Sequence, residues 1–227
     1  MDFDEFAADY SQQVDKVVAF SGQTQEFFLD AKARQIEEAI AKRFEEPFAL
    51  RALEVGCGTG LMQRRLRARI ARLWGIDSSL GSLAQAGNTG NRAKLVAADG
   101  RRVPFADGSF DLVFAVCVLH HVLPGERNAL VGEMARLTRP GGLVAIWEHN
   151  PWNPLTRRVV AHCPFDSDAV LLSLVETRRL LRRAGLSRVW SRSSLFFPWR
   201  GRLWERAEQL LAQVPLGAQF VAYGTKV

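Results

Sequence analysis

Five short apolar runs that alternate with stretches of helical composition constrain the fold of this chain more than any other feature. The runs are "FALRALEV" (48–55), "ARLWGID" (71–77), "AKLVAAD" (93–99), "FDLVFAVCV" (110–118) and "GGLVAIWEH" (141–149). Each run is rich in the residues that favour strands. Strands that alternate with helices form a parallel sheet that is covered on both faces. The sequence therefore predicts an α/β fold of the Rossmann-like type.

The segments on either side of these runs extend the pattern within one domain of 227 residues. Residues 1–46 form a predicted N-terminal helical segment, and residues 47–150 form the core of the sheet. In the C-terminal half, residues 170–227, we predict in order a helix, a strand, a helix and a last strand over 174–186, 188–197, 201–214 and 218–225. The prediction is thus a seven-stranded sheet with helices on both faces.

Residues 150–169, "NPWNPLTRRVVAHCPFDSDA", match neither a strand nor a helix pattern cleanly. Long inserts in compact domains are usually functional or disordered, and the aromatic residues argue against disorder. We expect this cap insert to cover a binding site. Arg157 and Arg158 within it either hold an anionic ligand or face solvent, and the sequence leaves both open.

The stretch "LEVGCGTG" (53–60) places three glycines, Gly56, Gly58 and Gly60, directly after the first strand. Missing side chains permit a tight turn and let a ligand lie against the backbone. Ligands of open parallel sheets bind beyond the carboxyl ends of the strands. The next two strands end there in Asp77 and Asp99, which suit ribose and base contacts or, alternatively, cap a helix or turn.

Glu54 distinguishes between the nucleotide ligands that such a turn can bind. A dinucleotide site usually reads G-x-G-x-x-G and holds a pyrophosphate at a helix N-terminus. Here the spacing is G-x-G-x-G, and Glu54 lies two residues before Gly56. A carboxylate repels a pyrophosphate and suits a cationic group. The sequence therefore predicts an adenosine ligand that carries a positive charge.

Four motifs in this order resemble the class I S-adenosylmethionine-dependent methyltransferases, in particular the small-molecule type labelled methyltransferase type 11. They are "LEVGCGTG", "WGID", "AADGRRVPFADGSFDLVFAVCVLHHV" and "LTRPGGLVAIWEHN". The resemblance covers about residues 48–150. It implies S-adenosyl-L-methionine as cofactor, and a seven-stranded sheet whose last strand is antiparallel.

The resemblance also implies residue roles. Glu54 and the glycine turn would lie near the methionine portion of the cofactor, Asp77 would bind the ribose hydroxyls, and Asp99 the adenine amino group. The cofactor-binding positions so implied are Glu54, Gly56, Cys57, Gly58, Gly60, Asp77, Asp99, Gly100 and Val116. The N-terminal helix of this family often closes over the cofactor, which adds Tyr10 and Lys32 as candidates.

Histidines after the fourth and fifth strands are the candidate catalytic groups. Methyl transfer from a sulfonium is an in-line displacement, so a base is needed only where the acceptor must lose a proton. His120 and His149 are the predicted bases, with His121 as a third candidate. The alternative for each is to orient a loop or to pack under the cofactor.

The cysteines and the N-terminus bear on where the protein works. Cys57, Cys117 and Cys163 are widely spaced and form neither a disulfide framework nor a zinc pattern, so we predict no metal and a reducing compartment. The acidic N-terminus lacks the plan of a signal peptide, and the longest apolar run is too short to span a bilayer. We therefore expect a cytoplasmic protein.

Three functions are compatible with these residues. The first is methyl transfer to a small-molecule acceptor or a lipid or natural-product precursor, and the second is methyl transfer to tRNA or DNA. The net charge of +6 is compatible with a nucleic acid, but "VCVLHHV" (116–122) lacks the Asn or Asp with two prolines common in DNA amino-methyltransferases. We therefore expect no nucleic-acid partner and leave the oligomeric state open. The third function is a cofactor-binding module without catalysis.

Overall fold

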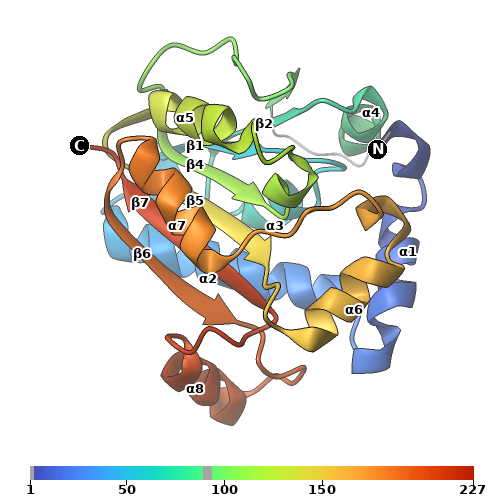
Figure 1. Cartoon of the computed structure of the whole chain (residues 1–227). Helices are drawn as coiled ribbons and strands as arrows, with labels where there is room; N and C mark the ends of the chain where they lie inside the picture. Colours follow the sequence, from blue (N-terminus) through green and yellow to red (C-terminus); the bar gives the residue numbers. More distant parts are fainter. Residues whose placement is uncertain (1–2, 89–93) are drawn as a thin grey trace.

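A seven-stranded sheet forms the centre of the computed structural model, which describes residues 3–88 and 94–227 (Figure 1). The strands are β1 (Arg51–Val55), β2 (Arg72–Asp77), β3 (Lys94–Ala97), β4 (Phe110–Val116), β5 (Thr138–His149), β6 (Ser187–Ser194) and β7 (Gln219–Thr225). Their order is β3-β2-β1-β4-β5-β7-β6. All neighbours are parallel except β7, which runs antiparallel to both β5 and β6. The predicted fold class, including the antiparallel last strand, is confirmed.

Alternation along the strands builds two hydrophobic layers, one on each face of the sheet. In β4, Leu112 and Phe114 pack with α2 (Gln25–Arg43) and α3 (Leu61–Leu66). Val113 and Ala115 pack on the other face, against α5 (Arg127–Leu137) and α7 (Leu174–Arg183). Successive side chains of a strand point to opposite faces, so continuous apolar runs such as "LVFA" suit a sheet that is covered on both sides (Figure 1).

The other helices frame the sheet. They are α1 (Tyr10–Val18), α4 (Leu80–Asn88), α6 (Pro154–His162) and α8 (Arg202–Leu211), with the short 3-10 turns η1 (Phe3–Phe6), η2 (Ala19–Ser21), η3 (Pro47–Ala49), η4 (Leu119–His121) and η5 (Pro164–Asp166). Helix α6 lies within the predicted cap insert and begins at Asn153, whose side chain accepts from the amides of Leu155 and Thr156. It lies beside α1 (Figure 1), and the ring centroids of Tyr10 and Phe165 are 4.8 Å apart.

Some element boundaries differ from the sequence prediction. The N-terminal helical segment is interrupted between α1 and α2, where Gly22 has a left-handed φ of 69°. Strand β5 begins at Thr138, which pairs with Phe110, rather than at Gly141. Residues 1–2 and Ala93, which belonged to predicted elements, lie outside the described residues. Within the described ranges, no helix is both long and apolar enough to cross a membrane.

Arg127 ties the turn after β4 to the rest of the domain. Its side chain is 1% exposed. Nε donates to the carbonyls of Leu119 and Val122, both at 3.1 Å, and Nη2 donates to the carbonyl of Val170. Nη1 pairs with Glu176 of α7 at 2.9 Å. One guanidinium thus joins η4, the segment after the cap insert, and α7.

Replacing this guanidinium by an apolar side chain should destabilise the fold. In Arg127→Leu the carbonyls of Val122 and Val170 lose their donor, and each orphaned carbonyl costs about 1–3 kcal/mol. We expect the free energy of unfolding to fall by about 2–5 kcal/mol in urea titrations. The matched control is Arg179→Leu on the exposed side of α7, which should change it by less than about 0.5 kcal/mol. Equal values for both variants would contradict this role of Arg127.

Candidate functional site

A cavity of about 880 Å³ lies at the carboxyl ends of β1, β2 and β4. Its walls also include residues of α1, α2, α6 and the 195–199 segment. Ligand cavities usually measure about 300–1,000 Å³, so this one is near the upper end. Its position agrees with the rule that ligands of open parallel sheets bind at this edge.

The structure brings nearly all of the predicted site residues to this cavity. The wall contains Glu54, Gly56, Cys57, Gly58, Asp77, Asp99, Gly100, Val116, His120, His121 and His149, together with Tyr10 and Lys32. Gly60 is the exception, because it is buried at the start of α3, where it has a left-handed φ of 73°. Gly60 therefore allows the backbone conformation of the turn and does not itself line the cavity.

The glycine turn depends on the missing side chains and on Asp77. Gly56 has φ of 71°, and a Cβ there would lie 2.5 Å from a methyl carbon of Val118. The amide of Gly58 donates to Oδ2 of Asp77 at 2.7 Å, and the amide of Ser79 donates to Oδ1 at 2.9 Å. The half-buried Asp77 carboxylate thus lies at the cavity wall. The two amide bonds fix its position and also stabilise the glycine turn.

Glu54 brings a buried carboxyl group with an unused oxygen to the same wall. The side chain is 2% exposed, and among the described residues no donor reaches its Oε2. Burial, and then the nearby charge of Asp77, raise the pKa of Glu54 well above its usual range. A buried polar atom without a partner is rare in native structures. A ligand with a hydrogen-bond donor or a positive charge can therefore supply the missing partner of Oε2.

Asp99, Gly100 and Val116 line a more open part of the cavity. Asp99 is exposed, and its Oδ1 accepts from the amide of Arg101 at 3.0 Å. Gly100 has φ of 76°, and a Cβ there would lie 2.6 Å from Cδ1 of Leu130. Val116 is half-buried at the end of β4. This region combines a carboxylate with close backbone and apolar contacts.

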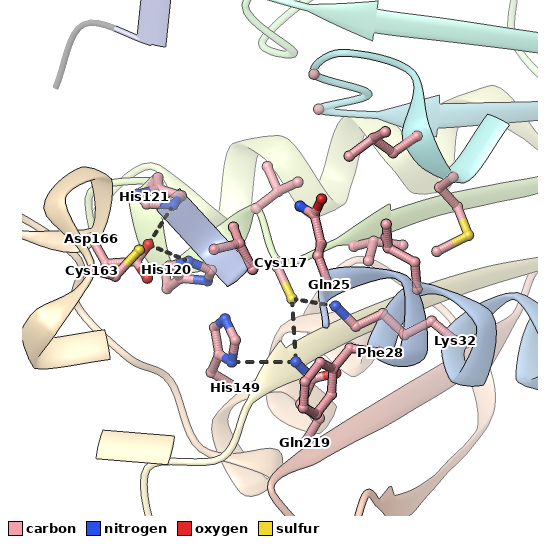
Figure 2. A pocket seen from close by; sticks show the side chains of 18 of the residues that line it. Gln25, Phe28, Lys32, Cys117, His120, His121, His149, Cys163, Asp166 and Gln219 are labelled. Carbon is pink, nitrogen blue, oxygen red and sulfur yellow. Dashed lines mark hydrogen bonds and ion pairs between the residues drawn. The ribbon is translucent and has the colours of Figure 1, made fainter. Parts of the chain in front are cut away.

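A polar cluster of Lys32, Cys117, His149 and Gln219 occupies another part of the wall (Figure 2). Nζ of Lys32 lies 3.4 Å from Sγ of Cys117, and Nε2 of Gln219 lies 3.9 Å from the same sulfur and 3.4 Å from Nδ1 of His149. Lys32 is 7% exposed and Gln219 6%. Within the described chain, Oε1 of Gln219 has no hydrogen-bond partner.

The thiol of Cys117 is unusually acidic. Burial alone would raise its pKa, but the Lys32 ammonium and His149 lower the pKa to about 7. Cys117 also has a left-handed φ of 57°, which is uncommon for a residue other than glycine. The sequence analysis did not assign a role to Cys117 or Gln219. The available signal was that Cys117 directly follows a strand at the ligand-binding edge.

His120 lies between two carboxylates. Its Nδ1 is 2.6 Å from Oε2 of Glu148, and its Nε2 is 3.5 Å from Oδ1 of Asp166. Burial would lower the pKa of His120, but Glu148 and Asp166 raise it to about 10. His149 is half-buried, and its ring centroid is 5.1 Å from that of His120. Both histidines face the cavity, but His120 has its ring nitrogens engaged.

The cap insert forms one side of the cavity. Its wall residues include Leu155, Val159, Cys163 and Phe165. Arg157 and Arg158 are exposed on α6, which agrees with the solvent-facing alternative.

Comparison with known proteins supports the class that this fold and cavity define. The family model described as "Methyltransferase domain" matches residues 53–146. The demethylmenaquinone methyltransferase of Parafrankia sp. (strain EAN1pec) is 38% identical over an alignment of 128 positions, which covers 47% of this chain and 50% of that protein.

Solved structures agree in fold. A possible histamine N-methyltransferase from Thermotoga maritima, described as SAM-dependent, has a TM-score of 0.68 at 20% identity, with coverage of 99% of this chain and 98% of that one. Phosphoethanolamine N-methyltransferase 2 of Haemonchus contortus, in complex with S-adenosyl-L-methionine, has a TM-score of 0.59 at 20% identity, with coverage of 85% and 52%.

The strand order with an antiparallel β7, and a glycine turn at the cavity wall, define the class I methyltransferase fold. In fold, and in sequence over residues 53–146, this chain is similar to class I S-adenosylmethionine-dependent methyltransferases, which supports S-adenosyl-L-methionine as its cofactor. The matched segment spans about half the length of the curated relatives.

Selective alkylation should reveal the acidic thiol in this wall. At neutral pH we expect iodoacetamide to modify Cys117 before Cys57 and Cys163, because burial and nearby carboxyl groups raise the pKa of those two thiols. The rate should rise with pH through a midpoint of about 7. Peptide mass spectrometry after timed quenching measures the order in which the cysteines are modified and the pH dependence of the rate.

Lys32→Met should raise the midpoint for Cys117, because it removes the cation beside the sulfur. Lys42→Met, an exposed position at the end of the same helix, is the matched control and should leave the midpoint unchanged. Equal reactivity of the three cysteines would contradict this assignment.

Proposed function

We propose that this chain methylates a small organic acceptor that binds in the same cavity as the cofactor. The observation that carries the proposal is the division of that cavity. One part holds the glycine turn with Glu54 and Asp77, and another holds the Lys32–Cys117–His149–Gln219 cluster beside the cap insert. The first part suits a cationic nucleoside, and the second offers polar groups to a second molecule.

The first part fits S-adenosylmethionine through its own chemistry. The unpaired Oε2 of buried Glu54 suits an ammonium or a sulfonium centre, and Asp77 offers a carboxylate for the ribose hydroxyls. Asp99, at the same cavity, would accept from the adenine amino group. When bound, the cofactor would supply a sulfonium methyl group whose carbon forms a bond to the lone pair of the acceptor, while the S–C bond breaks and its electrons leave with the sulfur of S-adenosylhomocysteine.

The chain contributes mainly position and exclusion of water. Helices α1 and α6 and the turn η5 all line the cavity, and Tyr10 of α1 contacts Phe165 of η5 there. We propose that the cap insert covers the acceptor in this way. Holding two reactants in line at short distance in a dry site accounts for much of the acceleration of such displacements.

The polar cluster would orient the acceptor. The Lys32 ammonium and the unpaired Oε1 of Gln219 offer a donor and an acceptor of hydrogen bonds at the wall. His149 lies beside Gln219, where it can take the proton of an acceptor that must lose one. His120, which is held by Glu148 and Asp166, is better suited to positioning than to proton abstraction.

The dimensions of the site favour a small acceptor over a nucleic acid. An extruded base would need a wide groove for the flanking nucleotides, whereas α1 and α6 lie directly beside each other at this cavity. The names of the three proteins compared above give demethylmenaquinone, histamine and phosphoethanolamine, which supports the same class.

The ribose contact of Asp77 is testable by binding alone. Asp77→Ala should weaken the affinity for S-adenosylhomocysteine roughly 30- to 150-fold, because two hydroxyls would lose their acceptor at a cost of about 2–3 kcal/mol. Isothermal titration calorimetry measures the change. Asp107→Ala, at an exposed carboxylate outside the cavity, is the matched control. An unchanged affinity in Asp77→Ala would contradict the cofactor assignment of this residue.

The acceptor class is testable with radiolabelled cofactor. Incubating the protein with methyl-labelled S-adenosylmethionine and a cell extract separated into small molecules, nucleic acids and proteins should place the label in the small-molecule fraction. Asp77→Ala should abolish that label, and Asp107→Ala should not. Label in DNA or tRNA would overturn the small-molecule proposal in favour of the nucleic-acid alternative.

A further inference from the structure

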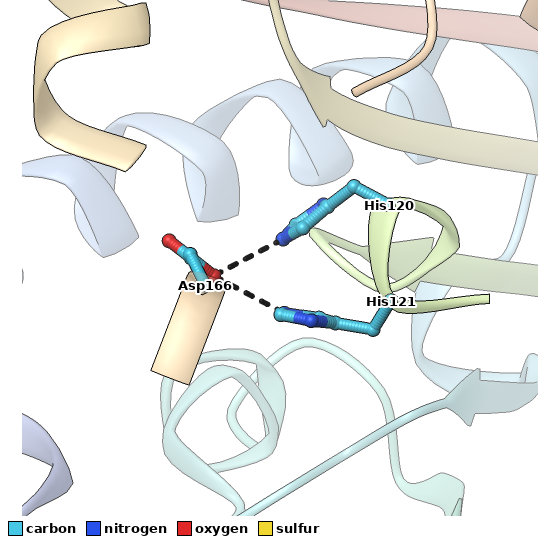
Figure 3. A group of neighbouring side chains, drawn as sticks. All are labelled: His120, His121 and Asp166. Carbon is cyan, nitrogen blue, oxygen red and sulfur yellow. Dashed lines mark ion pairs between the residues drawn. The ribbon is translucent and has the colours of Figure 1, made fainter. Parts of the chain in front are cut away.

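Three metal-binding side chains from two separate segments meet at one side of the cavity (Figure 3). His120 and His121 belong to η4 after β4, and Asp166 belongs to η5 in the cap insert. One ligand atom of each residue lies within 4.8 Å of the other two. His120 and Asp166 are buried, and His121 is half-buried. The cluster is therefore shielded from solvent on most sides.

The distances in this cluster suit a shared ion better than hydrogen bonds. Oδ1 of Asp166 lies 3.5 Å from Nε2 of His120 and 3.3 Å from Nε2 of His121. Charge-assisted hydrogen bonds between nitrogen and oxygen are shorter, at about 2.7–2.9 Å. Two ligands of a tetrahedral Zn²⁺ with bonds of about 2.0–2.1 Å are about 3.4 Å apart. The two separations that involve Asp166 match that edge length.

A second carboxylate orients the first histidine. Oε2 of Glu148 lies 2.6 Å from Nδ1 of His120, while Oε1 accepts from the amide of Leu119 at 2.7 Å. Glu148 is completely buried. Because Glu148 occupies Nδ1, the ring presents Nε2 to Asp166. Histidines that bind metals almost always have such a carboxylate or carbonyl behind them, which fixes the tautomer.

The charges in the cluster match a divalent cation. Glu148 and Asp166 each supply one negative charge, and both imidazoles supply nitrogen ligands once the cation displaces the proton that the two carboxylates hold on His120. Imidazole with a carboxylate suits Zn²⁺ and other first-row transition metals rather than Mg²⁺ or Ca²⁺, which prefer oxygen ligands. We propose that His120, His121 and Asp166 bind a divalent first-row transition-metal ion, with Zn²⁺ as the best fit, in a site with three protein ligands.

The remaining coordination position gives the ion a role in the cavity. Sites with three protein ligands keep a position for water or substrate, and all three ligands here line the cavity wall. The ion would bind an oxygen of the acceptor, such as a hydroxyl, enol or carboxylate, and lower the pKa of a bound hydroxyl. The preference for acceptors that contain oxygen rests on the proposed methyl transfer. The binding of the metal ion is independent of that proposal.

Metal binding can be measured on the full chain without cofactor or acceptor. After removal of bound metals with a chelator, titration with Zn²⁺ should show one tight site per chain, and Co²⁺ should give the visible absorption of a four-coordinate ion. His121→Ala and Asp166→Asn should each lose this binding. Glu148→Gln should weaken it about 10- to 100-fold, as is usual for the partner of a metal-binding histidine.

The matched control is His162→Ala on the exposed side of α6, which should bind Zn²⁺ like the native chain. Affinity for S-adenosylhomocysteine, measured separately, shows whether each variant is folded and tests the proposed function independently. For the native chain, Zn²⁺ should shift the Nε2 resonances of His120 and His121 and leave His162 unchanged. Absence of a tight site, shifts at other histidines only, or unaltered binding in a folded His121→Ala or Asp166→Asn variant would overturn the proposal.

Discussion

The buried carboxylate of Glu148 is the interaction on which the geometry of the cavity depends most. It accepts from the amides of Val118 and Leu119 and holds Nδ1 of His120. It therefore fixes the backbone directly after β4, although it belongs to the neighbouring strand β5. Burial would raise the pKa of Glu148, but His120 and the other donors lower it, so the group remains charged. A side chain without an acceptor oxygen here would leave the buried amides of Val118 and Leu119 unpaired and would release the turn that carries both histidines.

The fold, and the meeting of Glu54, the glycine turn and Asp77 at one cavity wall, were predictable because their signals are local. The apolar runs gave the strands, and the glycine spacing with Glu54 and Asp77 indicated the nucleoside side. The polar cluster was not predictable in the same way. Lys32 and Gln219 are separated from Cys117 by 85 and 102 positions, and only the completed sheet brings them together. Asp166 was read as part of an aromatic cap, because nothing in its neighbourhood indicates that η5 returns it to His120.

The division of the cavity also explains what the comparisons can establish. The family match covers residues 53–146, which include the glycine turn, Asp77, Asp99 and the histidine turn. Lys32, Asp166 and Gln219 lie outside that range, on α2, η5 and β7. These three residues, which are proposed to contact the acceptor or the metal ion, thus lie outside the family match. The match therefore bears on the cofactor side of the cavity and not on the identity of the acceptor.

The antiparallel direction of β7 decides which ends of the chain are free for attachment. Because β7 runs against the other strands, its first residue, Gln219, pairs with His149 at the cavity edge, and Thr225 pairs with Leu143 at the opposite edge. The C-terminus therefore emerges on the side of the molecule opposite α1 (Figure 1), whereas Phe3 and Tyr10 near the N-terminus are among the residues that line the cavity. Fluorophores, affinity tags or surface tethers joined after Val227 leave the cavity accessible, and the same groups joined at the N-terminus would stand beside it.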